Sequence, residues 1–126
     1  MNNMPSLQVN WVKNSNNNES FDLLRLNLNA PYFLNKVGVY VIWYASPSGV
    51  NKVIRVGQGD IASRLKEHRS NPEILRYSSY GQLKVTWALL NSQEDRNGVE
   101  AYLYDSYSPL IGERSPAAQP ISVNLI

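Results

Sequence analysis

A hairpin built from two β-branched segments constrains this chain more than any other feature. Residues 38–45, GVYVIWYA, form a dense run of β-branched and aromatic side chains, which is the composition of a central strand. Residues 52–57, KVIRVG, are a second such run, and residues 46–51, SPSGVN, have the composition of a turn. A connection this short joins antiparallel neighbours. The sequence therefore predicts an antiparallel hairpin at the centre of the fold.

A helix and a third strand are expected after the hairpin. Residues 60–70 predict a helix that Asp60 caps, with apolar residues spaced to face a core, and Pro72 ends it. Residues 82–90, QLKVTWALL, alternate apolar and polar side chains as a half-buried strand does. The third strand would extend the hairpin into a small sheet.

A second helix and a short tail complete the predicted elements. Residues 92–109 begin at Ser92, a good N-cap, carry acidic residues in the first turn and end at a proline. Gly98 is an unfavourable residue within this helix. Residues 121–126 predict a short extended piece after a turn-rich stretch.

These elements predict an α+β fold with a β-β-α-β-α core. Its three-stranded antiparallel sheet would be flanked by helices. We assign residues 37–126 to this folded domain and residues 1–36 to an Asn-rich N-terminal extension. Residues 21–36 within the extension carry several leucines and fit either a short strand or a docking segment.

Composition excludes several classes of site. The 126 residues include no cysteine and one histidine, so disulfides, thiolate zinc sites, cysteine nucleophiles and His-rich metal sites are excluded within one chain. No apolar run approaches the ~20 residues that cross a membrane, and no secretory signal is recognisable. We therefore expect a cytoplasmic protein that does not contact membranes. The formal charge of +2 permits a nucleic-acid partner without requiring one.

Four short motifs, in this order and in this frame, resemble those of one nuclease superfamily. They are GVY at 38–40, RVG at 55–57, the R-x-x-x-H spacing of Arg64 and His68, and a carboxylate, Glu100, in the helix after the third strand; Asn124 follows in the tail. The set resembles the GIY-YIG nuclease superfamily over most of residues 37–125. The resemblance implies a metal-dependent endonuclease that hydrolyses phosphodiester bonds of DNA, with Mg²⁺ or another divalent cation such as Mn²⁺ as its cofactor.

The resemblance gives each polar residue an expected role. Glu100 would bind the metal, which takes its other ligands from water and substrate phosphate. Arg64 would hold phosphate oxygens through its planar fork, unless it is only a surface arginine paired with Glu67 or Asp60. His68 lies one helical turn away and would accept a proton from Tyr40 or from water, unless both residues serve packing alone. Asn124 would complete the site.

A wider set of residues is expected to contact the substrate. Arg55 stands where the resembling family has its second tyrosine, so it would add a cation rather than orient water. Gly57 would let the backbone approach the phosphate. The cations Lys66 and Arg69 are expected to follow the DNA backbone, with Lys52 and Arg76 near them around the hairpin and the first helix. Trp43, Tyr77 and Tyr80 are candidates for stacking on bases, although most such aromatics are core or rim residues.

Two other functions stay open at the level of sequence. The arginine at position 55 favours a nucleic-acid-binding module of the same fold that no longer cuts. The weak net charge is also compatible with a protein-interaction domain. Because the chain leaves little room for a separate DNA-reading domain, specificity would come from the extension, a homodimer or a separate partner.

Overall fold

The centre of the molecule is a four-stranded antiparallel sheet. The computed structural model describes residues 5–114 and 117–126, so residues 1–4 of the predicted extension and 115–116 of the tail lie outside the described residues. The strands follow the order β2 (Phe21–Asp22), β5 (Gln82–Leu89), β3 (Val37–Ala45) and β4 (Asn51–Asp60). The predicted α+β class is confirmed. The predicted count of three strands is wrong, because the short β2 of the extension pairs with β5.

The β3–β4 hairpin contains one irregularity, near its middle. Ile42 pairs with Arg55 and Trp43 pairs with Val53, so Ile54 is an extra residue without a partner across the ladder. Such a β-bulge bends a strand and redirects the side chains beside it. Since β4 is the last strand in the order, the bulge lies on an edge of the sheet.

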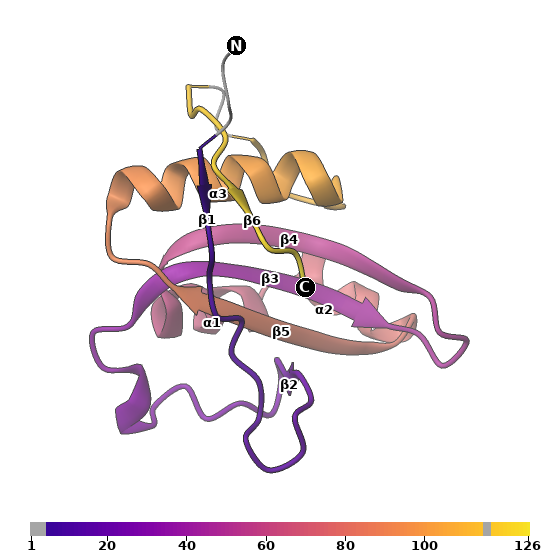
Figure 1. Cartoon of the computed structure of the whole chain (residues 1–126). Coiled ribbons are helices and arrows are strands. Elements are labelled where there is room, and N and C mark those ends of the chain that lie inside the picture. Colours follow the sequence, from indigo (N-terminus) through magenta and orange to yellow (C-terminus); the bar gives the residue numbers. More distant parts are fainter. Residues whose placement is uncertain (1–4, 115–116) are drawn as a thin grey trace.

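Helices cover both faces of the sheet (Figure 1). One face packs against α1 (Ile61–Arg69), α2 (Pro72–Leu75) and the turn η2 (Arg76–Ser79); the other packs against α3 (Gln93–Tyr107) and the parallel pair of β1 (Ser6–Leu7) and β6 (Ser122–Val123). Alternate residues of β3 divide accordingly: Tyr40 and Ile42 belong to the first core, Val39 and Val41 to the second. Two cores therefore share one sheet.

The helix ends follow the predicted capping residues. The Asp60 carboxylate accepts a hydrogen bond from the Ser63 amide at 3.0 Å. Ser92 accepts one from the Asp95 amide at 3.2 Å at the start of α3. Both N-caps satisfy amides that have no partner inside the helix.

Gly98 has a packing role that the sequence did not predict. A Cβ at this position would lie 2.5 Å from Cγ1 of Ile121 and 2.8 Å from the carbonyl oxygen of Gln119. The Ile121 amide also donates to the Gly98 carbonyl at 2.9 Å. The glycine therefore lets the tail cross α3 at close range, which offsets its low helix propensity.

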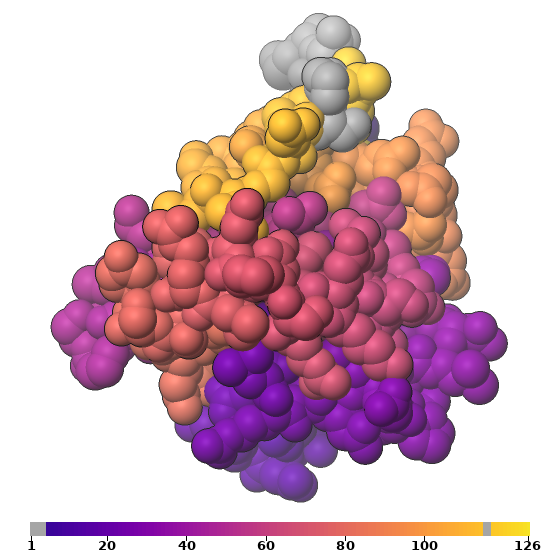
Figure 2. All heavy atoms as spheres, turned by 180° about the vertical axis from the view of Figure 1, so that it is seen from behind, coloured from indigo at the N-terminus to yellow at the C-terminus, as the bar shows by residue number. Residues whose placement is uncertain are grey.

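The N-terminal segment is part of the packed structure. Leu23, Leu28 and Phe33, the last within the turn η1 (Pro31–Phe33), are buried in the core beneath α1 and α2. The Val12 amide donates to the Trp87 carbonyl at 2.8 Å and so holds the segment along β5. Figure 2 shows residues 61–75 at the centre of this face, with the N-terminal segment directly beneath them. Among the described residues, no helix has both the length and the apolar character to cross a membrane.

Candidate active site

Tyr40 lies across the backbone of the neighbouring strand, and Gly57 makes that possible. The two residues are paired between β3 and β4. A Cβ on Gly57 would come within 2.1 Å of the Tyr40 hydroxyl oxygen and 2.4 Å of the ring carbon that carries it. Any side chain at position 57 would therefore displace the ring. From the sequence, Gly57 was expected to let the backbone approach phosphate. In the structure, its lack of a side chain leaves room for the Tyr40 ring, which we call its seating role.

The Tyr40 hydroxyl and the His68 imidazole form a buried hydrogen bond. The oxygen lies 2.6 Å from Nε2, and the side chains are 0% and 3% exposed respectively. Tyr40 comes from β3, while His68 comes from the last turn of α1, which lies against β3 and β4. The two residues that the sequence linked through proton transfer are thus in direct contact.

The electrostatic surroundings keep His68 neutral. Burial lowers the pKa of His68 to about 4, and the charges of Arg55 and Arg64 act in the same direction. A neutral ring accepts a hydrogen bond from Tyr40 through one nitrogen and carries its proton on the other. That other nitrogen, Nδ1, is buried without a partner among the described residues. Burial also raises the pKa of Tyr40, although Arg64 and Arg55 oppose the rise.

Arg55 lies on the same face of the sheet as Tyr40, directly beside the β-bulge. Its pairing with Ile42 places it on the side of the sheet that holds Tyr40, since directly paired residues of a ladder share a face. Its Nε is buried and has no hydrogen-bond partner among the described residues. The guanidinium carbon lies 3.6 Å from where a Cβ on Gly112 would stand. The segment after α3 therefore borders this arginine.

Arg64 stands on α1, one turn before His68. Its Nη1 donates to the Glu67 carboxylate at 3.0 Å, which is the surface pairing that the sequence left open. Exposed pairs of this kind are worth about 0–1 kcal/mol. Its Nε is buried and unpartnered in the described part of the chain. Its Nε can therefore donate a hydrogen bond to an anion, while interactions with the Tyr40 hydroxyl raise the pKa of Arg64.

Glu100 approaches the arginines from the opposite layer. It lies on α3, which packs against the edge strand β4 from the face opposite to α1. Burial raises the pKa of Glu100, and the charges of Arg55 and Arg64 oppose that rise. Glu100 in turn helps to raise the pKa of Arg64. The three charged groups thus act on one another around the edge of the sheet.

Five of the predicted residues therefore form one electrostatic cluster, which we call the edge cluster: Tyr40, Arg55, Arg64, His68 and Glu100. It combines a hydroxyl–imidazole pair, two guanidinium groups and one carboxylate. Three buried nitrogen atoms of the cluster have no hydrogen-bond partner among the described residues: Nε of Arg55, Nε of Arg64 and Nδ1 of His68. Buried donors rarely stay unsatisfied, so such a cluster is suited to bind an anion with several oxygens.

Comparisons with known proteins identify no relative. No protein family, no curated protein and no solved structure matched this chain.

The donor set determines how a metal ion would fit. The described residues contain no group of three histidine, cysteine, aspartate or glutamate side chains that could hold one. Glu100 alone would have to hold Mg²⁺, which keeps several waters and accepts phosphate oxygens as ligands. The half-buried carboxylate fits that mode because it lies beside the two arginines that would bring the phosphate.

Asn124 does not join the edge cluster. Its Oδ1 accepts from the Val9 amide at 2.8 Å, and its Nδ2 donates to the Val9 carbonyl at 2.9 Å. Both ends of the side chain are therefore used to hold the N-terminal segment. This pairing gives Asn124 a structural role and leaves few bonds for a substrate, while its expected catalytic role stays a prediction.

The two cations of α1 that were predicted to contact the DNA backbone differ in their surroundings. Arg69 donates to the Leu26 carbonyl at 2.7 Å and so fastens the N-terminal segment to α1. Lys66 is exposed on the same helix, and its ammonium group has no ion pair among the described residues. Lys66 stays a candidate for phosphate contact, whereas Arg69 already has a structural partner.

Sequence patterns missed the segment that borders Arg55. The amides of Leu110 and Ile111 donate to the carbonyls of Val53 and Ile54 at 3.2 and 2.9 Å, so the chain after α3 covers the outer edge of β4 at the bulge. Position 112 has a φ of 94°, which glycine adopts freely. Pro109 and Gly112 were visible as turn residues, but nothing in the sequence indicated which strand they would meet.

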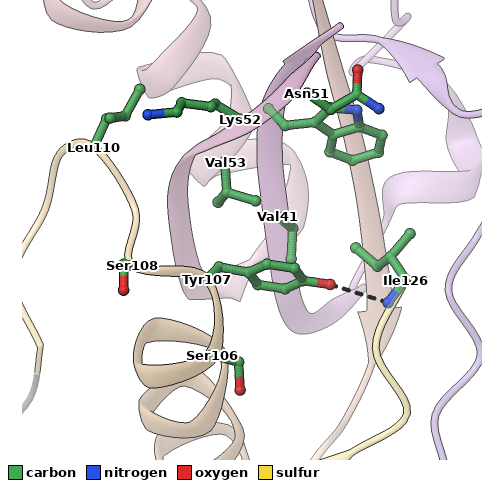
Figure 3. Close-up of a pocket in the computed structure, with 10 residues that line it drawn as sticks. Val41, Asn51, Lys52, Val53, Ser106, Tyr107, Ser108, Leu110 and Ile126 are labelled. Carbon is green, nitrogen blue, oxygen red and sulfur yellow. Dashed lines mark hydrogen bonds between the residues drawn. The ribbon is translucent and has the colours of Figure 1, made fainter. Parts of the chain in front are cut away.

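A cavity of about 490 Å³ lies on the α3 side of the sheet (Figure 3). Val41, Val53 and Tyr107 line it, and the Tyr107 hydroxyl accepts a hydrogen bond from the Ile126 amide at 3.1 Å. None of the residues in the edge cluster lines this cavity. The hollow and the polar cluster are therefore separate features.

Proposed function

We propose that this chain is a divalent-metal-dependent DNA endonuclease that hydrolyses phosphodiester bonds at the edge cluster. The observation that carries the proposal is the buried Tyr40–His68 hydrogen bond beside two guanidinium groups with unpartnered donors. The resemblance of the motifs to the GIY-YIG superfamily supports the same reaction. The 2.6 Å bond supports the proposal, because it gives the tyrosine proton an acceptor in the neutral imidazole.

The arginines would bind the scissile phosphate. Arg55 from the bulged strand and Arg64 from α1 approach the cluster from different elements, so they can hold different oxygens of one phosphoryl group. Charge-assisted bonds of this kind stabilise the additional negative charge of the transition state. The orphaned Nε atoms then gain acceptors.

Tyr40 and His68 would accept the proton of the attacking water. The water oxygen forms a bond to phosphorus while the bond to the leaving oxygen breaks. The Tyr40 oxygen accepts a water proton as its own proton passes to Nε2 of His68, which the neutral ring permits. A bound phosphate would also offset the two arginine charges that disfavour imidazolium.

Glu100 would hold the divalent cation. When bound, such a cation acts as a Lewis acid that stabilises the leaving oxygen. Burial raises the pKa of Glu100, while Arg55 and Arg64 limit that rise and so favour the carboxylate that would hold the cation.

The direct test is nicking of supercoiled plasmid DNA with and without Mg²⁺. We expect Mg²⁺-dependent nicking by the wild type and its loss, by about 100-fold or more, in Glu100→Gln and Tyr40→Phe. Glu94→Gln is the matched control, since Glu94 is exposed in the first turn of α3. Nicking that persists in Glu100→Gln, or that falls equally in Glu94→Gln, would show that the reacting site lies elsewhere.

A second candidate is a module that binds nucleic acid without cutting it. Arg55 favours this function, because a guanidinium cannot accept a proton as a tyrosine in its place could. Binding that weakens as salt rises, together with an absence of nicking in Mg²⁺ and Mn²⁺, would identify it. Salt-independent binding, or none, would instead favour a protein-interaction domain.

A further inference from the structure

Three tyrosine rings gather at the far end of the strand that carries Tyr40. Tyr44 of β3 lies 5.6 Å from Tyr80 and 6.1 Å from Tyr77 between ring centroids, and the other two rings are 5.9 Å apart. The angle between ring planes is 29° for Tyr44 and Tyr80, 8° for Tyr44 and Tyr77, and 35° for Tyr77 and Tyr80. We call this group the tyrosine platform. Tyr44 stacks on both of the other rings, which are tilted relative to each other, and no pair has the edge-to-face arrangement that is also common between aromatics.

The tyrosine platform is only partly used by the protein's own core. Tyr44 and Tyr77 pack against the core beneath α1 and α2, while Tyr80 is 56% exposed. Among the described residues, no hydrogen bond to a hydroxyl of the platform is found. The guanidinium of Arg76 lies 5.2 Å from the ring centroid of Tyr77 and adds a positive charge to the surface. Stacked rings, an exposed ring face and a cation are features of surfaces that bind nucleobases and their phosphates.

The position of the platform relates it to the edge cluster. Tyr44 follows Tyr40 by four residues on β3, so period-two alternation gives both the same face. At about 3.3 Å per residue they stand about 13 Å apart along the strand. That length corresponds to about four stacked nucleotides at about 3.4 Å each, or fewer in an extended strand. The tyrosine platform and the edge cluster therefore lie on one face of the sheet, within the length of a short nucleic-acid strand.

We propose that the tyrosine platform binds unpaired nucleobases, so that the substrate is DNA with a single-stranded segment beside the bond that is cut. In a duplex the faces of the bases are covered by their neighbours, and only an unpaired base can stack on protein rings. The inference rests on the proposed function for the choice of DNA, and adds to it a class of substrate. Trp43, expected from the sequence to stack on bases, packs with the α3 core instead.

The experiment compares binding of a fluorescent single strand of about 20 nucleotides with binding of the matched duplex, by anisotropy in EDTA to prevent cleavage. We expect the wild type to prefer the single strand. Tyr80→Ala should weaken single-strand binding by roughly 5- to 100-fold and change duplex binding less than about twofold. Tyr80→Phe, which keeps the ring, should bind as the wild type does. Leu34→Ala is the matched control, because Leu34 is 74% exposed and lies outside the platform.

The outcomes separate this inference from the proposed nuclease. Single-strand binding that is unchanged in Tyr80→Ala, or lost equally for duplex, would overturn the platform as a base-binding surface. If Arg64→Ala still weakens both forms in that case, the phosphate site stands without the platform. If Tyr80→Ala loses single-strand binding while the wild type never nicks DNA, the platform stands and the nuclease proposal fails.

Discussion

His68 provides the sharpest test of the edge cluster, because its protonation is coupled to folding. It is the one histidine of the chain, so its titration can be followed without overlap. Its pKa falls from the ordinary 6.5 to about 4 in the folded protein, chiefly through burial. Above pH 6.5 the ring is neutral in both states. Between pH 6.5 and about 4 the unfolded chain binds a proton that the folded chain does not, so the free energy of unfolding falls as pH falls.

The size of this effect follows from the pKa difference. Each pH unit within the window is worth about 1.4 kcal/mol, so the full loss is about 3 kcal/mol, of which about 2 kcal/mol is lost between about pH 7 and pH 5. A typical domain has a stability of about 5–15 kcal/mol, so the loss is measurable. The raised pKa of Glu100 has the opposite sign and partly masks it in the wild type.

The assay is urea unfolding, followed by tryptophan fluorescence at about pH 7, 6 and 5. His68→Gln is the comparison, because glutamine is neutral at every pH and its amide can still pair with the Tyr40 hydroxyl. Every carboxyl group, Glu100 included, is present in both proteins, so the carboxyl contributions cancel in the difference. The wild type should lose about 2 kcal/mol more than His68→Gln between about pH 7 and pH 5.

Two results would refute this reasoning. A stability difference between wild type and His68→Gln that does not change with pH would mean that folding leaves the histidine pKa unperturbed. An NMR titration of the His68 ring with a midpoint near the ordinary pKa of about 6.5 would show the same thing directly. In either case the imidazole would not be held neutral beside Tyr40, and its role as a ready proton acceptor would be lost.

Three further substitutions test other contacts. Gly57→Ala should displace the Tyr40 ring, cost about 1–3 kcal/mol in urea unfolding and reduce nicking roughly 100-fold; unchanged activity would contradict the seating role. Asn124→Ala should cost about 1–3 kcal/mol, because the amide and carbonyl of Val9 lose their partners, but should not alter the nicking rate of the folded protein. A large loss of nicking would return Asn124 to the site. Gly98→Ala should destabilise despite the better helix propensity of alanine, and a higher melting temperature would disprove the close approach of the tail.

Local patterns in the sequence predicted the elements well. The hairpin, the Asp60 and Ser92 caps and the ends of both main helices follow from chemistry within a few residues, where intrinsic preference and neighbouring side chains agree. The fourth strand escaped prediction because Phe21–Asp22 is only two residues long and exists through its pairing with β5. A strand that short has no periodicity of its own to detect.

The composition of the site was only partly predictable. The helical spacing of Arg64 and His68 predicted their common face, and the tripeptide pattern indicated Tyr40, which contacts His68. Asn124 could not be placed from the sequence, because its partner Val9 is 115 positions away. The bulge beside Arg55 could not be predicted, because it adds one residue to β4 and leaves no recognisable pattern in the sequence.

The parallel pairing of β1 with β6 has a consequence for the order of folding. Ser6 meets Ser122 and Leu7 meets Val123, so this ladder closes a loop of nearly the whole chain. Loop closure of that length costs more entropy than any local contact, and such pairings form late. The hairpin and its helices can assemble first, and β1 and β6 then pair across the α3 side of the sheet. The same ladder should be the first to open, with the amides of β1 and β6 exchanging with solvent well before those of β3.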